Sequence, residues 1–224
     1  MDNLQLQENA DTTGIVSEKT KFVEKPVYDF FKRAFDIVSS LFALIVLSPV
    51  FLIVSIVIMA DDPGNPFYVQ MRTGKNGKDF KMYKFRSMYM DAENKRNELL
   101  EQNEADGPIF KIADDPRVTK IGKFIRKTSI DELPQLVNIL KGEMSVIGPR
   151  PLPTYEQAAC NEYQQKRLLV KPGLSCYTAL DKKSEENFDN WIELDMKYIR
   201  ERSFATDIKI IFRTIGVVLG HKNY

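Results

Sequence analysis

The sequence predicts an α/β, mainly helical cytosolic domain with a short β-hairpin. We expect it to be anchored by a membrane helix that Ser48-Pro49 breaks and by amphipathic helices at the interface. Three observations predict this class: residues 37–60 are apolar and uncharged, residues 67–88 alternate around an Asn-Gly pair, and the C-terminal third has helical periodicity. The expected parts are a polar tail at 1–25, a membrane segment at 26–62 and the cytosolic domain at 63–224.

The apolar run is long enough to cross a lipid bilayer, since roughly 24 residues rise about 36 Å as a straight helix. Pro49, near its middle, has no N–H to donate and frees the carbonyl of Ile45 from its helical hydrogen bond. The hydroxyl of Ser48 can satisfy that carbonyl, which hydrocarbon cannot. We therefore expect a bend at this position.

Basic residues flank the apolar run on both sides, with Lys32 and Arg33 before it and Arg72 and Lys75 after it. Positive charge marks the cytoplasmic side of a membrane. A re-entrant hairpin that enters and returns through one leaflet keeps both flanks on that side. A kinked single span is the alternative, because proline is common in membrane helices.

Composition argues against a nucleic-acid-binding protein and against a disulfide-rich one. The chain has 32 Lys plus Arg against 31 Asp plus Glu, so its net charge predicts no nucleic-acid partner. Cys160 and Cys176 are too few for a disulfide framework and lack metal-ligand spacing, which indicates reduced cytosolic thiols.

The cytosolic domain should open with a hairpin over residues 67–88, turning at Asn76-Gly77. Helices are expected at 91–104, from about Asp131 to Gly142, and at 155–168, 188–202 and 206–219. The last helix carries an apolar stripe of Ile208, Ile211, Ile215 and Val218. Such a stripe packs on a core or lies on a membrane, and packing is the commoner fate.

Asp131 and Glu132 stand just before Pro134, a residue suited to a first helical turn. The structural interpretation makes Asp131 the N-cap or, in a shifted frame, makes Ser129 and Glu132 a capping box. The functional interpretation has the adjacent carboxylates hold a divalent cation, or one of them attack while the other handles a proton. The helix dipole would lower the pKa of Asp131.

Several basic side chains are candidates for binding phosphate. Arg126 precedes Asp131 by a few residues, and the stiff turn Gly148-Pro149-Arg150-Pro151 projects a second guanidinium. Arginine forks suit bidentate binding of a diphosphate. The further candidates are Lys84, Arg86 and Arg117.

These motifs together resemble one family, the bacterial sugar transferases that act as monotopic phosphoglycosyl transferases on polyprenyl phosphate. The likeness covers about residues 32–224. Its marks are Lys32-Arg33-x-x-Asp36, Ser48-Pro49, Gln70-x-Arg72-x-Gly74-x-x-Gly77, Tyr83-Lys84-Phe85-Arg86-Ser87-Met88, Asp115-Pro116-Arg117-Val118-Thr119, Arg126-Lys127-Thr128-Ser129-Ile130-Asp131-Glu132-Leu133-Pro134-Gln135 and Met144-Ser145-Val146-Ile147-Gly148-Pro149-Arg150-Pro151.

The resemblance implies transfer of a phospho-sugar from a UDP-sugar to polyprenyl (undecaprenyl) phosphate, with release of UMP, at the cytoplasmic face of the bacterial inner membrane. Asp131 would attack the phosphate next to the sugar and form a covalent phospho-sugar intermediate, in a reaction that needs Mg²⁺. Glu132 would assist by handling a proton or by positioning the metal ion. Arg126, Pro149 and Arg150 would contact the donor, with Lys84, Arg86 and Arg117 as further phosphate ligands. Such a reaction starts assembly of an exopolysaccharide, a capsule or a glycoconjugate.

Some questions stay open from the sequence. Ser175-Cys176-Tyr177 stands where many hexose-transferring relatives have a Thr-Gly-x-Trp-Gln stretch, so the sugar is not identified. Two alternatives to the covalent enzyme are a membrane-tethered adaptor without turnover and a transferase in which the lipid phosphate attacks directly. A homo-oligomer is also compatible with the sequence.

Overall fold

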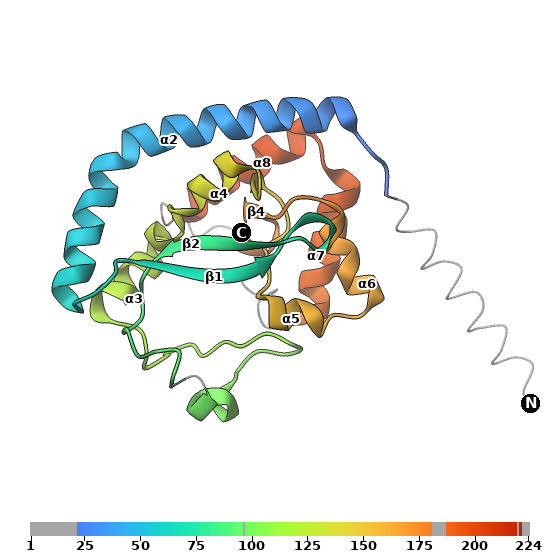
Figure 1. The fold of residues 1–224 in the computed structure, drawn as a ribbon. Coiled ribbons are helices and arrows are strands. Elements are labelled where there is room, and N and C mark those ends of the chain that lie inside the picture. The colour runs from blue at the N-terminus through green and yellow to red at the C-terminus, as the bar shows by residue number, and fades with distance from the viewer. Residues whose placement is uncertain (1–21, 96, 181–186, 219, 221–224) are drawn as a thin grey trace, which may run out of the picture.

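The fold is described by a computed structural model that covers residues 22–95, 97–180, 187–218 and 220. The described chain is mostly helical with two small sheets, which confirms the mainly helical character and the short hairpin of the predicted class (Figure 1). The α-helices are α2 (Pro26–Asp61), α3 (Lys120–Lys127), α4 (Gln135–Lys141), α5 (Thr154–Ala158), α6 (Glu162–Gln165), α7 (Phe188–Glu201) and α8 (Phe204–Val218). The strands are β1 (Phe67–Thr73), β2 (Asp79–Phe85), β3 (Ser145–Ile147) and β4 (Gly173–Ser175).

The apolar run forms the long helix α2, which bends between its two halves as it passes over the domain (Figure 1). Pro49 lies inside the helix, and the Ser48 hydroxyl donates to the Ile45 carbonyl at 2.8 Å. This is the expected replacement for the hydrogen bond that proline cannot make. The bend and its rescue by Ser48 therefore agree with the sequence.

Only one side of α2 contacts the domain. Leu44 and Leu47 pack with the core beneath α4 and β2, and Phe51 and Val54 pack near Phe85. The outward side leaves large apolar side chains exposed: Val38, Leu41, Phe42, Ile45, Val46, Leu52, Ile53 and Ile56. α2 is long and apolar enough to cross a membrane. Because this outward side has no protein partner among the described residues, a lipid environment fits it; the re-entrant path stays a prediction.

The basic residues at the start of α2 attach the helix to the domain. Lys32 pairs with Asp207 of α8 at 2.6 Å, and Arg33 donates to the last carbonyls of α4, on Ile139 and Leu140. Asp36, 2% exposed, accepts from Ser145 and Val146 of β3. Lys32 and Arg33, predicted to lie on the cytoplasmic flank of the membrane segment, thus also make internal contacts with the domain.

The predicted hairpin is confirmed. β1 pairs antiparallel with β2 from Phe67 opposite Phe85 to Thr73 opposite Asp79, and both Asn76 and Gly77 in the turn have positive φ. A second, parallel pair of β3 and β4 was not predicted. Each of its strands has only three residues, too few for a period-2 pattern to be recognised. The two strands can lie this close together because Gly173 has no side chain. A Cβ at this position would overlap the backbone of Gly148.

The helix predictions had mixed outcomes. Helix α7 matches the predicted segment, and α4 ends as predicted at Gly142 in the left-handed region but begins at Gln135 rather than at about Asp131. The helix predicted at 91–104 is wrong, since the described residues there form turns and a 3-10 helix at Asn97–Gln102. The helix predicted at 155–168 is split, because Asn161 caps a new helix with Gln164 as its capping-box partner.

Of the predicted apolar stripe on the last helix, Ile211 packs against the core cluster of Ile147, Tyr198 and Ile210, but the other three residues do not. Ile208, Ile215 and Val218 are 41%, 48% and 48% exposed, while Ile210 and Asp207 are the buried residues of α8. Phe204 at the start of α8 contacts the ring of Tyr28 in α2 at 5.7 Å between centroids. The exposed face of α8 thus adjoins α2, which favours the membrane-surface alternative.

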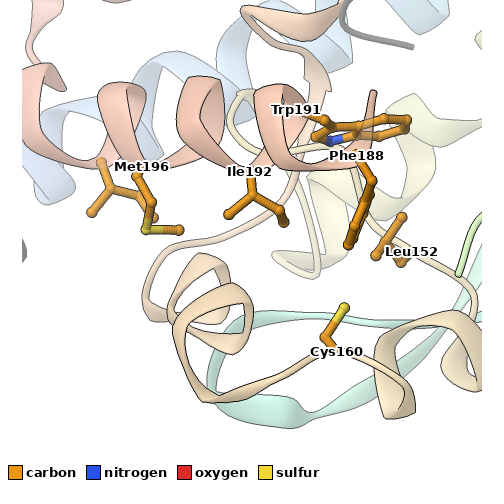
Figure 2. Packing of buried hydrophobic residues seen from close by; sticks show 7 residues of the cluster. Leu152, Cys160, Phe188, Trp191, Ile192 and Met196 are labelled. Atoms are coloured by element: carbon orange, nitrogen blue, oxygen red, sulfur yellow. The ribbon is translucent and has the colours of Figure 1, made fainter. Parts of the chain in front are cut away.

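The largest core cluster lies under α7. Figure 2 shows Leu152, Cys160, Phe188, Trp191, Ile192 and Met196 packed together there. Cys160 and Cys176 are both free and buried, in agreement with reduced thiols.

The segment before α2 also reaches the core. Phe22 packs against the cluster under α7 and stacks under the Arg202 guanidinium at 4.5 Å, while Arg202 donates to the Val23 carbonyl. Phe22 and Val23 of the predicted tail therefore contact the domain, and residues 1–21 lie outside the described residues, so the predicted division of the chain stays a prediction.

Candidate active site

Asp131 and Glu132 lie in a single 3-10 turn, Ile130–Glu132, that joins α3 to α4. Ser129 precedes the turn in the left-handed region with φ 56°, and Pro134 is the residue before α4. Neither helix start has a side-chain cap hydrogen bond. Both capping interpretations of this motif are therefore wrong, and the two carboxylates are available for another role.

The two carboxylates have different partners. Glu132 Oε1 accepts from Lys84 Nζ of β2 at 2.8 Å and from Arg150 of the Gly-Pro-Arg-Pro turn at 3.1 Å. Asp131 Oδ2 lies 3.8 Å from the same Lys84 Nζ and accepts no hydrogen bond from the residues that the structure describes. Asp131 is thus the carboxylate that a ligand can reach without displacing a hydrogen bond.

The electrostatics separate the pair further. Burial raises the pKa of Asp131 above its usual value, and the negative charge of Glu132 adds to this, against the opposing effect of Lys84. The expectation that a helix dipole lowers this pKa is corrected, since Asp131 begins no α-helix. For Glu132 burial acts in the same upward direction, but Lys84 and Arg150 outweigh it and bring the pKa to about 2.

A pKa of about 2 keeps Glu132 ionised at neutral pH, which argues against a proton-handling role. Its two hydrogen bonds instead hold Lys84 and Arg150 on one side of Asp131. Lys84 is largely buried, and this burial lowers its pKa against the effect of Glu132. The site therefore presents one carboxylate without a hydrogen bond next to two oriented cations.

The remaining predicted residues divide into two groups. Arg126 donates from Nε to the Ser87 hydroxyl at 2.8 Å. Burial lowers the pKa of Arg126 against the opposing charge of Asp131, which places Arg126 beside the carboxylate pair. Arg117 belongs to the second group, whose side chains are occupied by contacts within the protein. It makes a bidentate pair with Asp115, both residues are about 6% exposed, and the Phe110 ring lies 5.3 Å from its guanidinium.

Arg86 is placed differently. It pairs with Asp62 at 3.2 Å and also donates to the Asp62 carbonyl, which ties the end of β2 to the end of α2. Arg86 is 7% exposed. Its contacts are therefore structural, in contrast to those of Lys84.

Arg72 was not among the predicted site residues, although it stands in one of the quoted motifs. Its guanidinium donates to the Pro151 carbonyl at 2.7 Å and to Gln70 at 2.7 Å. Burial and the neighbouring charge of Arg150 lower its pKa to about 10. The signal available in the sequence was the Gln70-x-Arg72 motif itself.

A divalent cation was predicted at Asp131, and the donor set fits one only together with a substrate. Among the described residues no group of three or more His, Cys, Asp or Glu side chains is placed to hold a metal ion. Mg²⁺ is commonly held by one or two carboxylates plus substrate phosphates and water. Asp131 can supply that single carboxylate, while Glu132 is occupied by its two cations.

Comparison with known proteins identifies the class. The sequence model of the family named bacterial sugar transferase matches residues 27–221, so the chain belongs to this family. The chain is 45% identical over 191 residues to the galactosyl transferase CpsE of Streptococcus agalactiae, covering 84% of this chain and 42% of that protein.

Two further relatives differ in how much of their length is matched. The exopolysaccharide production protein ExoY of Sinorhizobium fredii is 35% identical over 214 residues, 94% of each chain. The UDP-glucose:undecaprenyl-phosphate glucose-1-phosphate transferase of Escherichia coli is 36% identical over 211 residues, 85% of this chain and 42% of that protein. The chain thus spans about two fifths of the streptococcal and E. coli proteins and nearly all of the rhizobial one.

Proposed function

We propose that this chain transfers a phospho-sugar from a UDP-sugar to polyprenyl phosphate through a covalent intermediate on Asp131, with release of UMP. The observation that carries the proposal is the asymmetry of the two carboxylates. Glu132 is held by Lys84 and Arg150, whereas Asp131 accepts no hydrogen bond from the described residues. The relatives named as transferases onto undecaprenyl phosphate support the substrate class.

In the first step, a carboxylate oxygen of Asp131 bonds to the phosphorus next to the sugar. The bond from that phosphorus to the bridging oxygen breaks, and its electron pair leaves with UMP. Attack needs the ionised carboxylate, and Lys84, 3.8 Å away, favours that form. No proton has to move, which agrees with the permanent ionisation of Glu132.

In the second step, an oxygen of polyprenyl phosphate bonds to the same phosphorus and the Asp131 carboxylate leaves. The use of one site in turn lets a nucleotide and a large lipid share the same cations. Lys84 and Arg150 face the transferring phosphate in both steps, and Glu132 keeps them oriented so that little reorganisation is needed. Arg126 provides a further positive charge near Asp131.

Mg²⁺ bound to Asp131 and the diphosphate would neutralise the phosphate charge and stabilise the departing UMP. Lys84 and Arg150, which Glu132 holds near Asp131, would carry part of this task through their own positive charge.

The exposed apolar faces of α2 and α8 support a membrane location for this chemistry. A lipid phosphate lies at the membrane surface, and the donor is a cytosolic nucleotide sugar, so the inner leaflet of the bacterial cytoplasmic membrane is the site at which they meet. A re-entrant α2 would keep both of its ends, and the domain, on this side.

The proposed chemistry is tested by intact-protein mass spectrometry of detergent-purified wild type and Asp131→Asn, each incubated with Mg²⁺ and single UDP-sugars without lipid. Wild type is expected to gain the mass of one phospho-sugar and to release UMP, and the variant is expected to do neither. The sugar that reacts also identifies the donor. UMP that appears only after lipid is added would indicate direct attack by the lipid phosphate, and no turnover with any donor would favour a non-catalytic adaptor.

Topology is tested separately with Glu24→Cys and Lys75→Cys in intact cells, using a membrane-impermeant thiol reagent. Both positions are exposed, whereas the native Cys160 and Cys176 are buried and serve as the internal control. A re-entrant helix predicts no external labelling at either position. Labelling of one position alone would establish a single span.

A further inference from the structure

The turn that carries Arg150 is held at four consecutive carbonyl groups. The Pro149 carbonyl accepts from Gly173 N of β4 at 2.9 Å, and the Leu152 carbonyl accepts from Thr73 N of β1 at 3.2 Å. Arg167 donates to the Arg150 carbonyl at 2.6 Å, and Arg72 donates to the Pro151 carbonyl at 2.7 Å. The two prolines restrict φ in addition, so the main chain on both sides of Arg150 has little freedom.

Two of these four donors are main-chain groups, and the other two are arginine side chains. Arg72 lies near the Arg150 guanidinium and is only partly buried. Arg167 cannot meet a ligand, because its side chain is 2% exposed and lies behind the turn in the 3-10 helix Lys166–Leu169. Any effect of Arg167 on the reaction must therefore pass through the main chain of Arg150.

Arg167 is in turn oriented from α7. Its NH2 lies 2.6 Å from Asp195 Oδ2, Asp195 is also 2% exposed, and the Trp191 ring lies 6.0 Å from the guanidinium carbon. Burial raises the pKa of Asp195 to about 6, against the opposing effect of Arg167. A buried ion pair of this kind adds little net stability compared with apolar side chains of similar size. Its structural result is a guanidinium fixed at the Arg150 carbonyl.

We propose that Arg167, oriented by Asp195, is a positioning residue that fixes the main chain of Arg150 and so sets where the Arg150 guanidinium meets the donor diphosphate. The inference rests on the proposed function, since it assigns Arg167 a role only through donor binding by Arg150. A displacement of a binding group by about 1 Å can lower a reaction rate by about a hundredfold. Loss of Arg167 would therefore disturb the orientation of the Arg150 guanidinium, whose NH2 lies 3.1 Å from Glu132 Oε1.

The test uses the full-length protein in detergent and the neutral double variant Arg167→Met/Asp195→Leu, which removes both buried charges together. We expect it to fold with an unfolding midpoint at or above that of wild type. The initial rate of adduct formation is measured against UDP-sugar concentration. We expect kcat/KM to fall by about tenfold or more, mainly through a raised KM for the donor.

Coupling to Arg150 is measured by adding Arg150→Ala. If Arg167 acts through Arg150, the triple variant should lose no more activity than Arg150→Ala alone. A purely structural pair would instead give losses that multiply. Arg202→Met is the matched control, because Arg202 is also 2% exposed, follows the same helix α7 and donates to a main-chain carbonyl, that of Val23. It should leave kcat/KM for the donor unchanged.

The outcomes separate the two proposals. Wild-type activity in the folded double variant, or equal further losses with and without Arg150, would overturn the positioning role. So would a wild-type rate in Arg150→Ala, although adduct formation itself would then still support the transferase. If wild type forms no adduct with any donor, the proposed covalent mechanism fails first. Should the double variant not fold, Arg167→Lys keeps the charge but loses the planar fork, and is expected to show the same raised KM.

Discussion

Two charged networks lie on either side of the Arg150 turn and differ in their access to solvent. On the site side, Lys84, Glu132 and Arg150 have side chains 16%, 18% and 40% exposed. Behind the turn, Arg167 and Asp195 are each 2% exposed. A phosphate ligand from solvent can therefore reach the first network, whereas the second network contacts only other protein groups.

The two acidic groups in these networks show what decides a pKa inside a protein. Glu132 is contacted by two cations, which overcome its burial and bring its pKa to about 2. Asp195 is contacted by one cation and is more deeply buried, and its pKa is about 6. The presence of an ion pair therefore does not by itself predict whether the pKa of an acid rises or falls. The direction depends on whether the charges of its cationic partners outweigh the effect of burial.

The largest effect is expected at the open network, with Asp131→Asn. Loss of the proposed nucleophile should lower turnover by about 10³-fold or more. Because burial raises the pKa of Asp131, the ionised group opposes folding at neutral pH, and the variant should unfold no lower than wild type. Turnover and thermal unfolding measured on the same preparation check both statements, and a strongly lowered midpoint would mean that the lost activity reflects misfolding.

The next effect concerns the closed network and the dependence of stability on pH. The folded state holds a proton on Asp195 up to about pH 6, whereas the unfolded state releases it near 3.8. Stability therefore falls as pH rises through this interval, by about 3 kcal/mol for this group. In Asp195→Asn this dependence should be absent. Urea unfolding at pH 4, 5, 6 and 7 measures it, and parallel curves for the two proteins would contradict the assignment.

A smaller effect is expected for Lys84→Met in the open network. Losing one charge-assisted contact to phosphate, worth about 2 kcal/mol, should slow turnover about 30-fold. The pKa values of Asp131 and Glu132 should both rise, because Lys84 lowers them, so the acid side of the pH–rate profile should move to higher pH. Lys81→Met, on the same strand with an exposed side chain, is the control and should change neither quantity.

The smallest effect should come from an ion pair that belongs to neither network. Asp114 and Lys123 lie 2.7 Å apart but are 88% and 60% exposed. Asp114→Asn should change the free energy of unfolding by about 0.5 kcal/mol or less and leave turnover unaffected. A larger loss in chemical denaturation would show that proximity matters more than burial in this molecule.

Much of the local structure could be predicted from short-range rules. Asn76-Gly77 predicts the hairpin turn because both residues tolerate positive φ, and Gly142 ends α4 for the same reason. Pro49 and Ser48 predict the bend in α2 and the hydrogen bond that compensates for it. These rules involve residues only a few positions apart, so the sequence displays all of their partners.

Several predictions failed because the deciding partners are distant in the chain. The capping interpretation of Asp131 failed because the structure places this residue in a 3-10 turn, 3.8 Å from Lys84 of another element. The stripe on α8 was expected to pack, but Ile210 and Asp207 occupy the buried side and most of the stripe is exposed. Lys32 and Arg33 were interpreted only as cytoplasmic flanking charges, whereas their hydrogen bonds to Asp207 and to the end of α4 could not be predicted from the sequence.

The sequence by itself determined the mainly helical class, the bent apolar helix, the hairpin and the family, because periodicity, turn chemistry and motif order are written along the chain. Only the tertiary structure decided which carboxylate is unengaged, which arginines face the site and which hold it together. The physical reason is that burial and charge pairing act between Lys84, Glu132 and Arg150, and between Arg167 and Asp195, which meet only when the chain has folded.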